Sequence, residues 1–139
     1  MAIKMRVLYA SNKGKIAAMA SMLHAEFQLP INAVDKIPPA YSCDKERIVI
    51  LAISGKGRVS DSIRLFCREL TKARAQNVAL LIDGDAAIAD NVKSILAEAG
   101  TNVIDEVMYV KCGLFGSSVK PEEKTEIFAW IDRVIANLK

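Results

Sequence analysis

The chain has 139 residues, of which 52% are hydrophobic and 25% charged, and its formal net charge is +3. This length fits one domain, and the composition is typical of a globular core rather than of disorder. No apolar run reaches the ~18 residues of a membrane helix, and charges interrupt the first apolar stretch, so no signal peptide is expected. We therefore expect a single cytoplasmic domain over residues 1–139 that does not bind membranes.

Cysteine and charge usage narrow the classes of site and partner. Three scattered cysteines without a Cys-x-x-Cys pair, and a single histidine, argue against a disulfide framework or a zinc site. Residues 1–75 carry a net charge of +7 and residues 76–139 carry −4. The basic half either favours an anionic ligand or partner, or is an ordinary solvated surface. Nucleic acid is not expected, because no dense Lys/Arg run is interleaved with aromatic residues.

Strands and helices are expected to alternate from the start of the chain. Residues 4–10 predict a strand, and apolar positions between residues 16 and 23 recur with the spacing of one helix face. Residues 31–34 predict a short second strand. The continuous apolar run 48–53 predicts a strand buried on both faces, and an amphipathic helix follows between residues 63 and 70.

The second half continues the alternation. Residues 78–82 predict another strand, and residues 88–99 predict a helix that Gly100 ends. Residues 103–110 predict a last strand, although an acidic pair interrupts its apolar pattern. Pro121 suits the first position of the final helix.

This order of elements predicts the fold class. Alternating apolar strands and amphipathic helices require a parallel sheet that is covered on both sides. We expect an α/β protein, a three-layer α/β/α sandwich with a five-stranded parallel sheet in the order 2-1-3-4-5. Sites in such folds lie beyond the carboxyl ends of the strands. The loops 10–16, 54–59 and 83–87 are therefore the candidate site.

The first of these loops has the features of an anion site. It reads Ser11-Asn12-Lys13-Gly14-Lys15, between the first strand and the first helix. Unpaired N–H groups and the dipole at a helix start favour a phosphate, and two lysines add positive charge. The alternative is an ordinary turn with solvated lysines. Neither Gly-x-Gly-x-x-Gly nor a P-loop motif is present, so dinucleotide binding lacks its fingerprint.

The other two loops admit two interpretations each. The second reads Ser54-Gly55-Lys56-Gly57, and its glycines permit either a close backbone approach to a ligand or a plain turn. The third reads Asp83-Gly84-Asp85. It either binds a polar ligand edge or caps the next helix, and capping is the favoured interpretation.

Taken together, these segments resemble the short-chain flavodoxins over nearly the whole chain. The resemblance is carried by residues 9–16 (Tyr-Ala-Ser-Asn-Lys-Gly-Lys-Ile), by the glycine-rich second loop, by residues 66–70 (Phe-Cys-Arg-Glu-Leu) and by Gly84-Asp85. It implies non-covalent FMN binding, electron transfer and a redox partner protein, as an electron carrier or an oxidoreductase. It implies no catalytic side chain and no metal. The FMN-binding residues that it implies are Ser11, Asn12, Lys13, Gly14, Lys15, Ile16, Ser54, Gly55, Lys56, Gly57, Asp83, Gly84 and Asp85.

Departures from the flavodoxin pattern keep a second hypothesis open. In the phosphate loop Ser11 and Gly14 match the pattern, whereas Lys13, Lys15 and Ile16 replace Thr, Asn and Thr. The second and third loops contain no Trp, Tyr, Phe or Met to stack on a flavin ring. The alternative is a flavodoxin-fold protein that has lost flavin and serves as an anion-binding or regulatory module.

Overall fold

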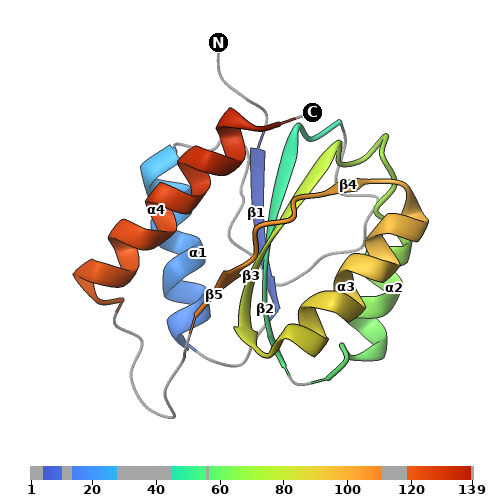
Figure 1. Cartoon of the computed structure of the whole chain (residues 1–139), viewed down its shortest axis with the longest axis horizontal. Helices are drawn as coiled ribbons and strands as arrows, with labels where there is room; N and C mark the ends of the chain where they lie inside the picture. The colour runs from blue at the N-terminus through green and yellow to red at the C-terminus, as the bar shows by residue number, and fades with distance from the viewer. Residues whose placement is uncertain (1–4, 11–13, 28–44, 56, 111–118, 139) are drawn as a thin grey trace.

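The computed structural model describes residues 5–10, 14–27, 45–55, 57–110 and 119–138 (Figure 1). Strands and helices alternate along these residues, as the sequence predicts. In chain order the elements are β1 (Met5–Ala10), α1 (Gly14–Phe27), β2 (Ile48–Gly55), α2 (Asp61–Glu69), β3 (Asn77–Gly84), α3 (Ala86–Ala99), β4 (Asn102–Val103), β5 (Met108–Tyr109) and α4 (Pro121–Ala136).

The strands form one parallel sheet. Its order is β1-β2-β3-β4, and β5 pairs with β3 as well. Val7, Ile50 and Ala79 lie side by side across the three long strands. The predicted strand at 31–34 lies outside the described residues, so the full order 2-1-3-4-5 stays a prediction.

Helices cover both faces of the sheet and make three layers, with α1 and α4 on one side and α2 and α3 on the other (Figure 1). The layers follow from the apolar run of β2, because successive side chains of a strand point to opposite faces. Ile48, Ile50 and Ala52 enter the core under α1 and α4. The residues between them enter the core under α2 and α3. The single tryptophan, Trp130, is fully buried in the α1–α4 core.

Helix ends confirm the sequence signals at three positions. The Asp85 carboxylate accepts a hydrogen bond from the backbone N–H of Ile88 at 3.0 Å, so capping of α3 is confirmed. Gly100 ends the same helix with a φ of 104°, in the left-handed region that suits glycine. Pro121 takes the first position of α4, as predicted.

The prediction of a single strand over residues 103–110 is wrong. Two strands of two residues replace it, β4 beside the start of β3 and β5 beside its end. Val78 and Leu81 of β3 are three residues apart, whereas their partners Val103 and Met108 are five apart. The chain therefore leaves the ladder between β4 and β5, in the manner of a bulge.

Side chains from two helices hold this interruption in place. The indole Nε1 of Trp130 donates to the backbone carbonyl of Glu106 at 2.8 Å. The Nζ of Lys93 donates to the carbonyl of Asp105 at 3.1 Å. These carbonyls bond to side chains rather than to a strand, which is the physical reason for the break.

Candidate functional site

The candidate loops follow strands that end at the same edge of the sheet. β1 ends at Ala10, β2 at Gly55 and β3 at Gly84, all parallel, and α1 and α3 begin just beyond that edge. This is the edge at which ligands bind in open parallel α/β sheets. The structure thus brings the second and third loops together, as the sequence predicts.

Four of the predicted site residues, Ser11, Asn12, Lys13 and Lys56, lie outside the described residues. Gly14 and Lys15 are the first residues of α1. Ile16 is fully buried in the α1–α4 core. The first turn of α1 contains no acidic residue, so no carboxylate of that turn neutralises the positive end of the helix dipole.

A hydrogen bond joins the ends of β2 and β3. Ser54 and Asp83 are register partners, and the Ser54 hydroxyl donates to the Asp83 carboxylate at 3.1 Å. Asp83 is only 9% exposed. Because a buried carboxylate needs such donors, Asp83 serves the structure of this edge as well as any ligand.

The glycines that follow this pair allow the two strands to end in close contact. A Cβ on Gly84 would overlap the carbonyl oxygen of Gly55, and a Cβ on Gly55 would come within 2.9 Å of the Ile88 side chain. The Gly55 backbone therefore explains the glycine at position 84, whereas at position 55 the nearest atom is the end of the Ile88 side chain. At Gly57, by contrast, an added Cβ would meet no atom within 4 Å, and its φ of +73° favours glycine.

The second loop is also tied to α3. The Gly57 N–H donates to the Asp85 carboxylate at 3.4 Å, the same oxygen that caps α3. The Val59 N–H donates to the Asn91 side chain at 3.0 Å. Asp85 therefore joins the second and third loops, a role that the sequence interpretation did not include.

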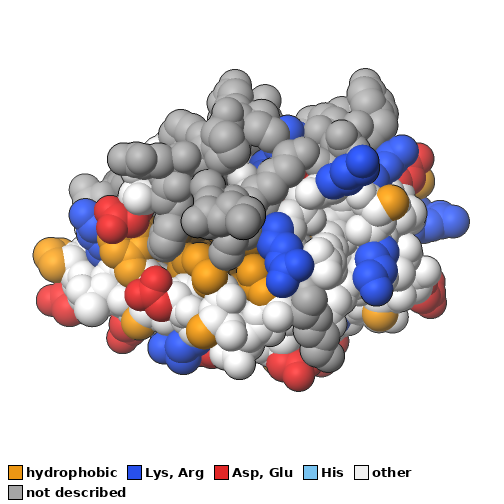
Figure 2. Space-filling model, turned by 90° about the horizontal axis from the view of Figure 1, so that it is seen from above, with side chains coloured by type: hydrophobic (Ala, Val, Ile, Leu, Met, Phe, Trp, Pro, Cys, Tyr) orange, Lys and Arg blue, Asp and Glu red, His pale blue; other side chains and the backbone are white. Residues whose placement is uncertain are grey.

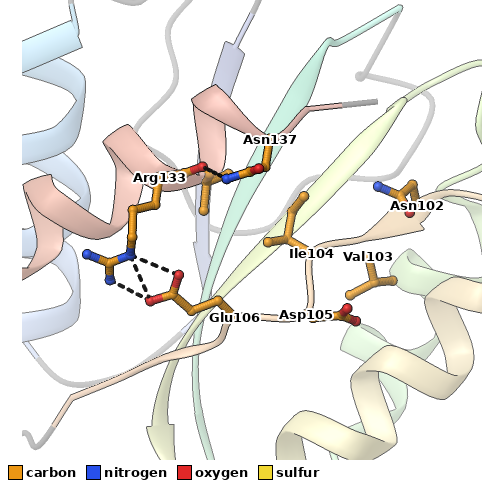
Figure 3. A pocket seen from close by; sticks show the side chains of 8 residues that line it. Asn102, Val103, Ile104, Asp105, Glu106, Arg133 and Asn137 are labelled. Carbon is orange, nitrogen blue, oxygen red and sulfur yellow. Dashed lines mark hydrogen bonds and ion pairs between the residues drawn. The ribbon is translucent and has the colours of Figure 1, made fainter.

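A groove away from this edge escaped the sequence analysis. It has a volume of about 410 Å³ and lies between the β4–β5 connection and the end of α4 (Figure 3). Its lining residues are Asn102, Val103, Ile104, Asp105, Glu106, Arg133, Val134 and Asn137. The only sequence signal was the acidic pair inside an apolar strand.

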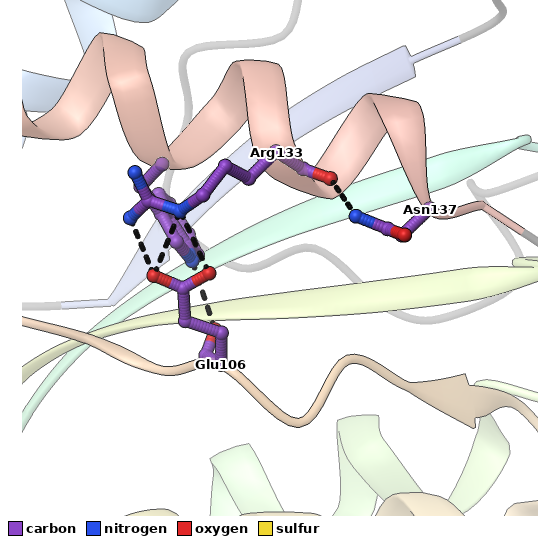
Figure 4. A network of polar contacts seen from close by, with 4 residues as sticks. Glu106, Arg133 and Asn137 are labelled. Atoms are coloured by element: carbon purple, nitrogen blue, oxygen red, sulfur yellow. Dashed lines mark hydrogen bonds and ion pairs between the residues drawn. The ribbon is translucent and has the colours of Figure 1, made fainter.

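The polar groups that line the groove bond largely to one another (Figure 4). The Arg133 guanidinium forms a two-pronged ion pair with Glu106, with Nε 3.0 and 3.2 Å from the two carboxylate oxygens. These hydrogen bonds lower the pKa of Glu106 below its usual value. Asn137 donates to the Arg133 carbonyl at 2.7 Å. The groove thus shows paired charges rather than a cation awaiting a ligand.

The described part of the chain holds neither a cluster of metal ligands nor a helix that could cross a membrane. No group of three His, Cys, Asp or Glu side chains is placed to hold a metal ion there. None of the helices in that part has the length and apolarity to span a bilayer.

Comparisons with protein-family models, with curated proteins and with solved structures gave no significant match to this chain. The flavodoxin resemblance therefore depends on the residues and the layered parallel sheet described above.

Proposed function

We propose that the chain is a flavodoxin-like protein that binds FMN non-covalently at the carboxyl edge of its parallel sheet and takes part in electron transfer. The observation that carries the proposal is the start of α1, which begins four residues after β1 ends at that edge. The free amides of a helix start bind phosphate, and the first turn of α1 brings no acidic residue. Two lysines next to this helix start in the sequence, Lys13 and Lys15, add positive charge to the proposed phosphate site.

The described residues fit a flavin ring in one respect. The second loop presents open space at Gly57, whose backbone a flat ligand can approach closely. The bound flavin would supply the redox chemistry, and the chain would hold and orient it. No side chain has to donate or accept a proton in this proposal.

One observation favours the alternative of an anion-binding or regulatory module without flavin. Asp85 bonds to the amides of both Ile88 and Gly57, so it holds the second loop against the third. Neither loop has an aromatic residue to stack on a ring, and stacking contributes about 0.5–1.5 kcal/mol. A small anion at the start of α1 would need neither loop to open.

The experiment is a titration of the purified chain with FMN, after its absorbance spectrum has been recorded. We expect flavin absorption bands or FMN binding that raises the melting temperature. The double variant Lys13→Glu and Lys15→Glu should weaken binding about tenfold or more, because it reverses the charge beside the phosphate.

The matched control is Lys120→Glu with Lys124→Glu, which makes the same change in net charge at the N-cap and in the first turns of α4. It should leave FMN binding unchanged. Absence of binding at high micromolar FMN would overturn the flavin proposal. A melting shift with inorganic phosphate but none with FMN would establish the alternative.

A further inference from the structure

The basic half of the chain gathers part of its charge at the amino end of the sheet. Residues 45–47 run beside residues 73–76, ahead of β2 and β3. The Lys45 N–H donates to the Ala73 carbonyl at 3.1 Å, and the Glu46 N–H to the Arg74 carbonyl at 3.0 Å. This ladder brings together cations that lie far apart in the sequence.

We call this surface the basic face. It consists of Leu65 and five cations, Lys45, Arg47, Arg68, Lys72 and Arg74, which come from α2, from the ladder and from the turn between them. Four of the cations are exposed and Arg74 is half-buried. Figure 2 looks onto the amino end of the sheet, and in it Lys and Arg side chains gather on the half where α2 lies.

The carboxylates of the described residues leave this charge unpaired. Arg64 and Arg133 have acidic partners, Asp61 and Glu106. By contrast, none of the five cations forms an ion pair with a carboxylate of the described residues. The negative end of α2 favours Arg68, but the other four cations lie beyond that helix.

The two acidic residues within residues 45–47 and 65–76, Glu46 and Glu69, do not cancel the excess of positive charge. Glu46 is 1% exposed and lies 3.6 Å from the Arg6 guanidinium, so it faces the interior. Glu69 is exposed. Within residues 45–47 and 65–76, five cations therefore stand against one exposed carboxylate, and this excess of positive charge attracts an anionic partner.

Leu65 indicates which class of anionic partner fits the basic face. Its side chain is 54% exposed, and it precedes Arg68 and Glu69 by three and four residues, so all three share one side of α2. An apolar side chain among arginines is typical of a protein interface, in which an apolar centre is bordered by charge. We propose that the basic face docks a partner protein through a segment rich in Asp and Glu that places an apolar side chain on Leu65.

Other anionic partners fit this face less well. The described residues 45–47 and 65–76 expose no aromatic ring on which a base could stack, since Phe66 is buried. One leucine contributes too little apolar area for attachment to a lipid surface. The face lies at the opposite end of the sheet from the proposed FMN site, so docking does not require flavin.

The test uses two synthetic peptides of equal length and equal acidic charge, one built from Glu and Ser and one with a central leucine. Binding to the intact chain is followed by fluorescence anisotropy at low salt. We expect the leucine peptide to bind about fivefold more tightly, because it alone buries apolar area on Leu65. Leu65→Ser should abolish that preference.

Charge reversal tests the cations. Arg68→Glu with Lys72→Glu should weaken binding of both peptides about tenfold, and added salt should weaken it further. The α4 variant Lys120→Glu with Lys124→Glu is the matched control and should bind as the unaltered chain does. FMN binding should be the same in the Arg68/Lys72 variant, which separates this proposal from the previous one.

Several results would overturn the proposal. They are equal binding of the two peptides, equal loss in the control variant, and tighter binding of duplex DNA or of phosphatidylserine vesicles than of the leucine peptide. The tryptophan emission of each variant verifies that it is folded.

Discussion

The thiol of Cys67 illustrates how burial decides the chemistry of a single group. It lies fully buried in the α2–α3 core and forms no disulfide. Desolvation raises its pKa to about 12, so the thiolate that reacts with oxidants and alkylating agents is almost absent at neutral pH. Although its segment contributes to the flavodoxin resemblance, Cys67 packs as a core residue.

The ion pair of the groove gives the opposite case, a perturbed group at the surface. Arg133 holds the pKa of Glu106 below its usual value through hydrogen bonds between exposed side chains. A lowered folded-state pKa means that the pair stabilises the fold above the ordinary pKa of glutamate. This contribution is lost as pH falls through the lowered value.

We therefore expect Arg133→Gln to raise the pKa of Glu106 toward its ordinary value. The measurement is an NMR titration of the side-chain carboxyl carbon between pH 2 and 7. Arg133→Lys is the control, and it should restore part of the shift because it keeps the charge but not the planar fork. An unchanged Glu106 titration in Arg133→Gln would show that the pair does not persist in solution.

At the scale of elements, Asp85 has the largest structural consequence for the candidate site. Its carboxylate caps α3 and accepts from the Gly57 amide, so one side chain both starts a helix and positions a loop. Helix caps of this kind contribute about 1 kcal/mol.

Replacing Asp85 with alanine should lower the free energy of unfolding by about 1 kcal/mol, measured by urea denaturation with Trp130 fluorescence. Asp85→Asn should keep most of the stability, since asparagine caps helices about as well. In the same alanine variant, the Gly57 N–H should lose its carboxylate acceptor. If the two variants prove equally stable, the capping bond is not maintained in solution.

The hydrophobic pattern of the sequence predicted strands and helices well where burial alone decides their position. The apolar runs of β2 and β3 are buried on both faces, and Gly100 and Pro121 mark helix ends as expected. The broken last strand was missed because the side chains that hold the break, Trp130 and Lys93, bond to carbonyls 24 and 12 residues away. No local pattern contains such a contact.

The candidate site was also predictable only as far as local sequence patterns reach. The sequence predicted that residues 54–57 and 83–85 meet, because parallel strands end at one edge, and that Asp85 caps a helix. It could not predict that a Cβ at position 84 would collide with the Gly55 carbonyl oxygen, or that the groove pairs Glu106 with Arg133, 27 residues away. Such pairings depend on tertiary packing.

At the scale of the whole molecule, the two cores share one sheet. Trp130 reports on the α1–α4 core, and Cys67 lies in the α2–α3 core. Strands β2 and β3 contribute side chains to both cores. Unfolding of one core would therefore expose strands that also form the other core. We infer that the layers unfold together.

The expected outcome is one urea midpoint for Trp130 emission and for labelling of Cys67 in a variant with Cys43→Ser and Cys112→Ser, in which Cys67 is the remaining cysteine. In native buffer the same variant should resist thiol reagents, and in denaturant it should react fully. Two separated midpoints would mean that one layer unfolds before the other.

The break between β4 and β5 also affects how molecules meet in concentrated solution. A long straight edge strand presents a row of free N–H and C=O groups. A strand of another molecule can pair with them, and such pairing begins aggregation. Here each border piece is two residues long, and the carbonyls of Asp105 and Glu106 are occupied by Lys93 and Trp130. Among the described strands, this border is thus poorly suited to seed fibril growth, a safeguard built from the same indole that fills the core.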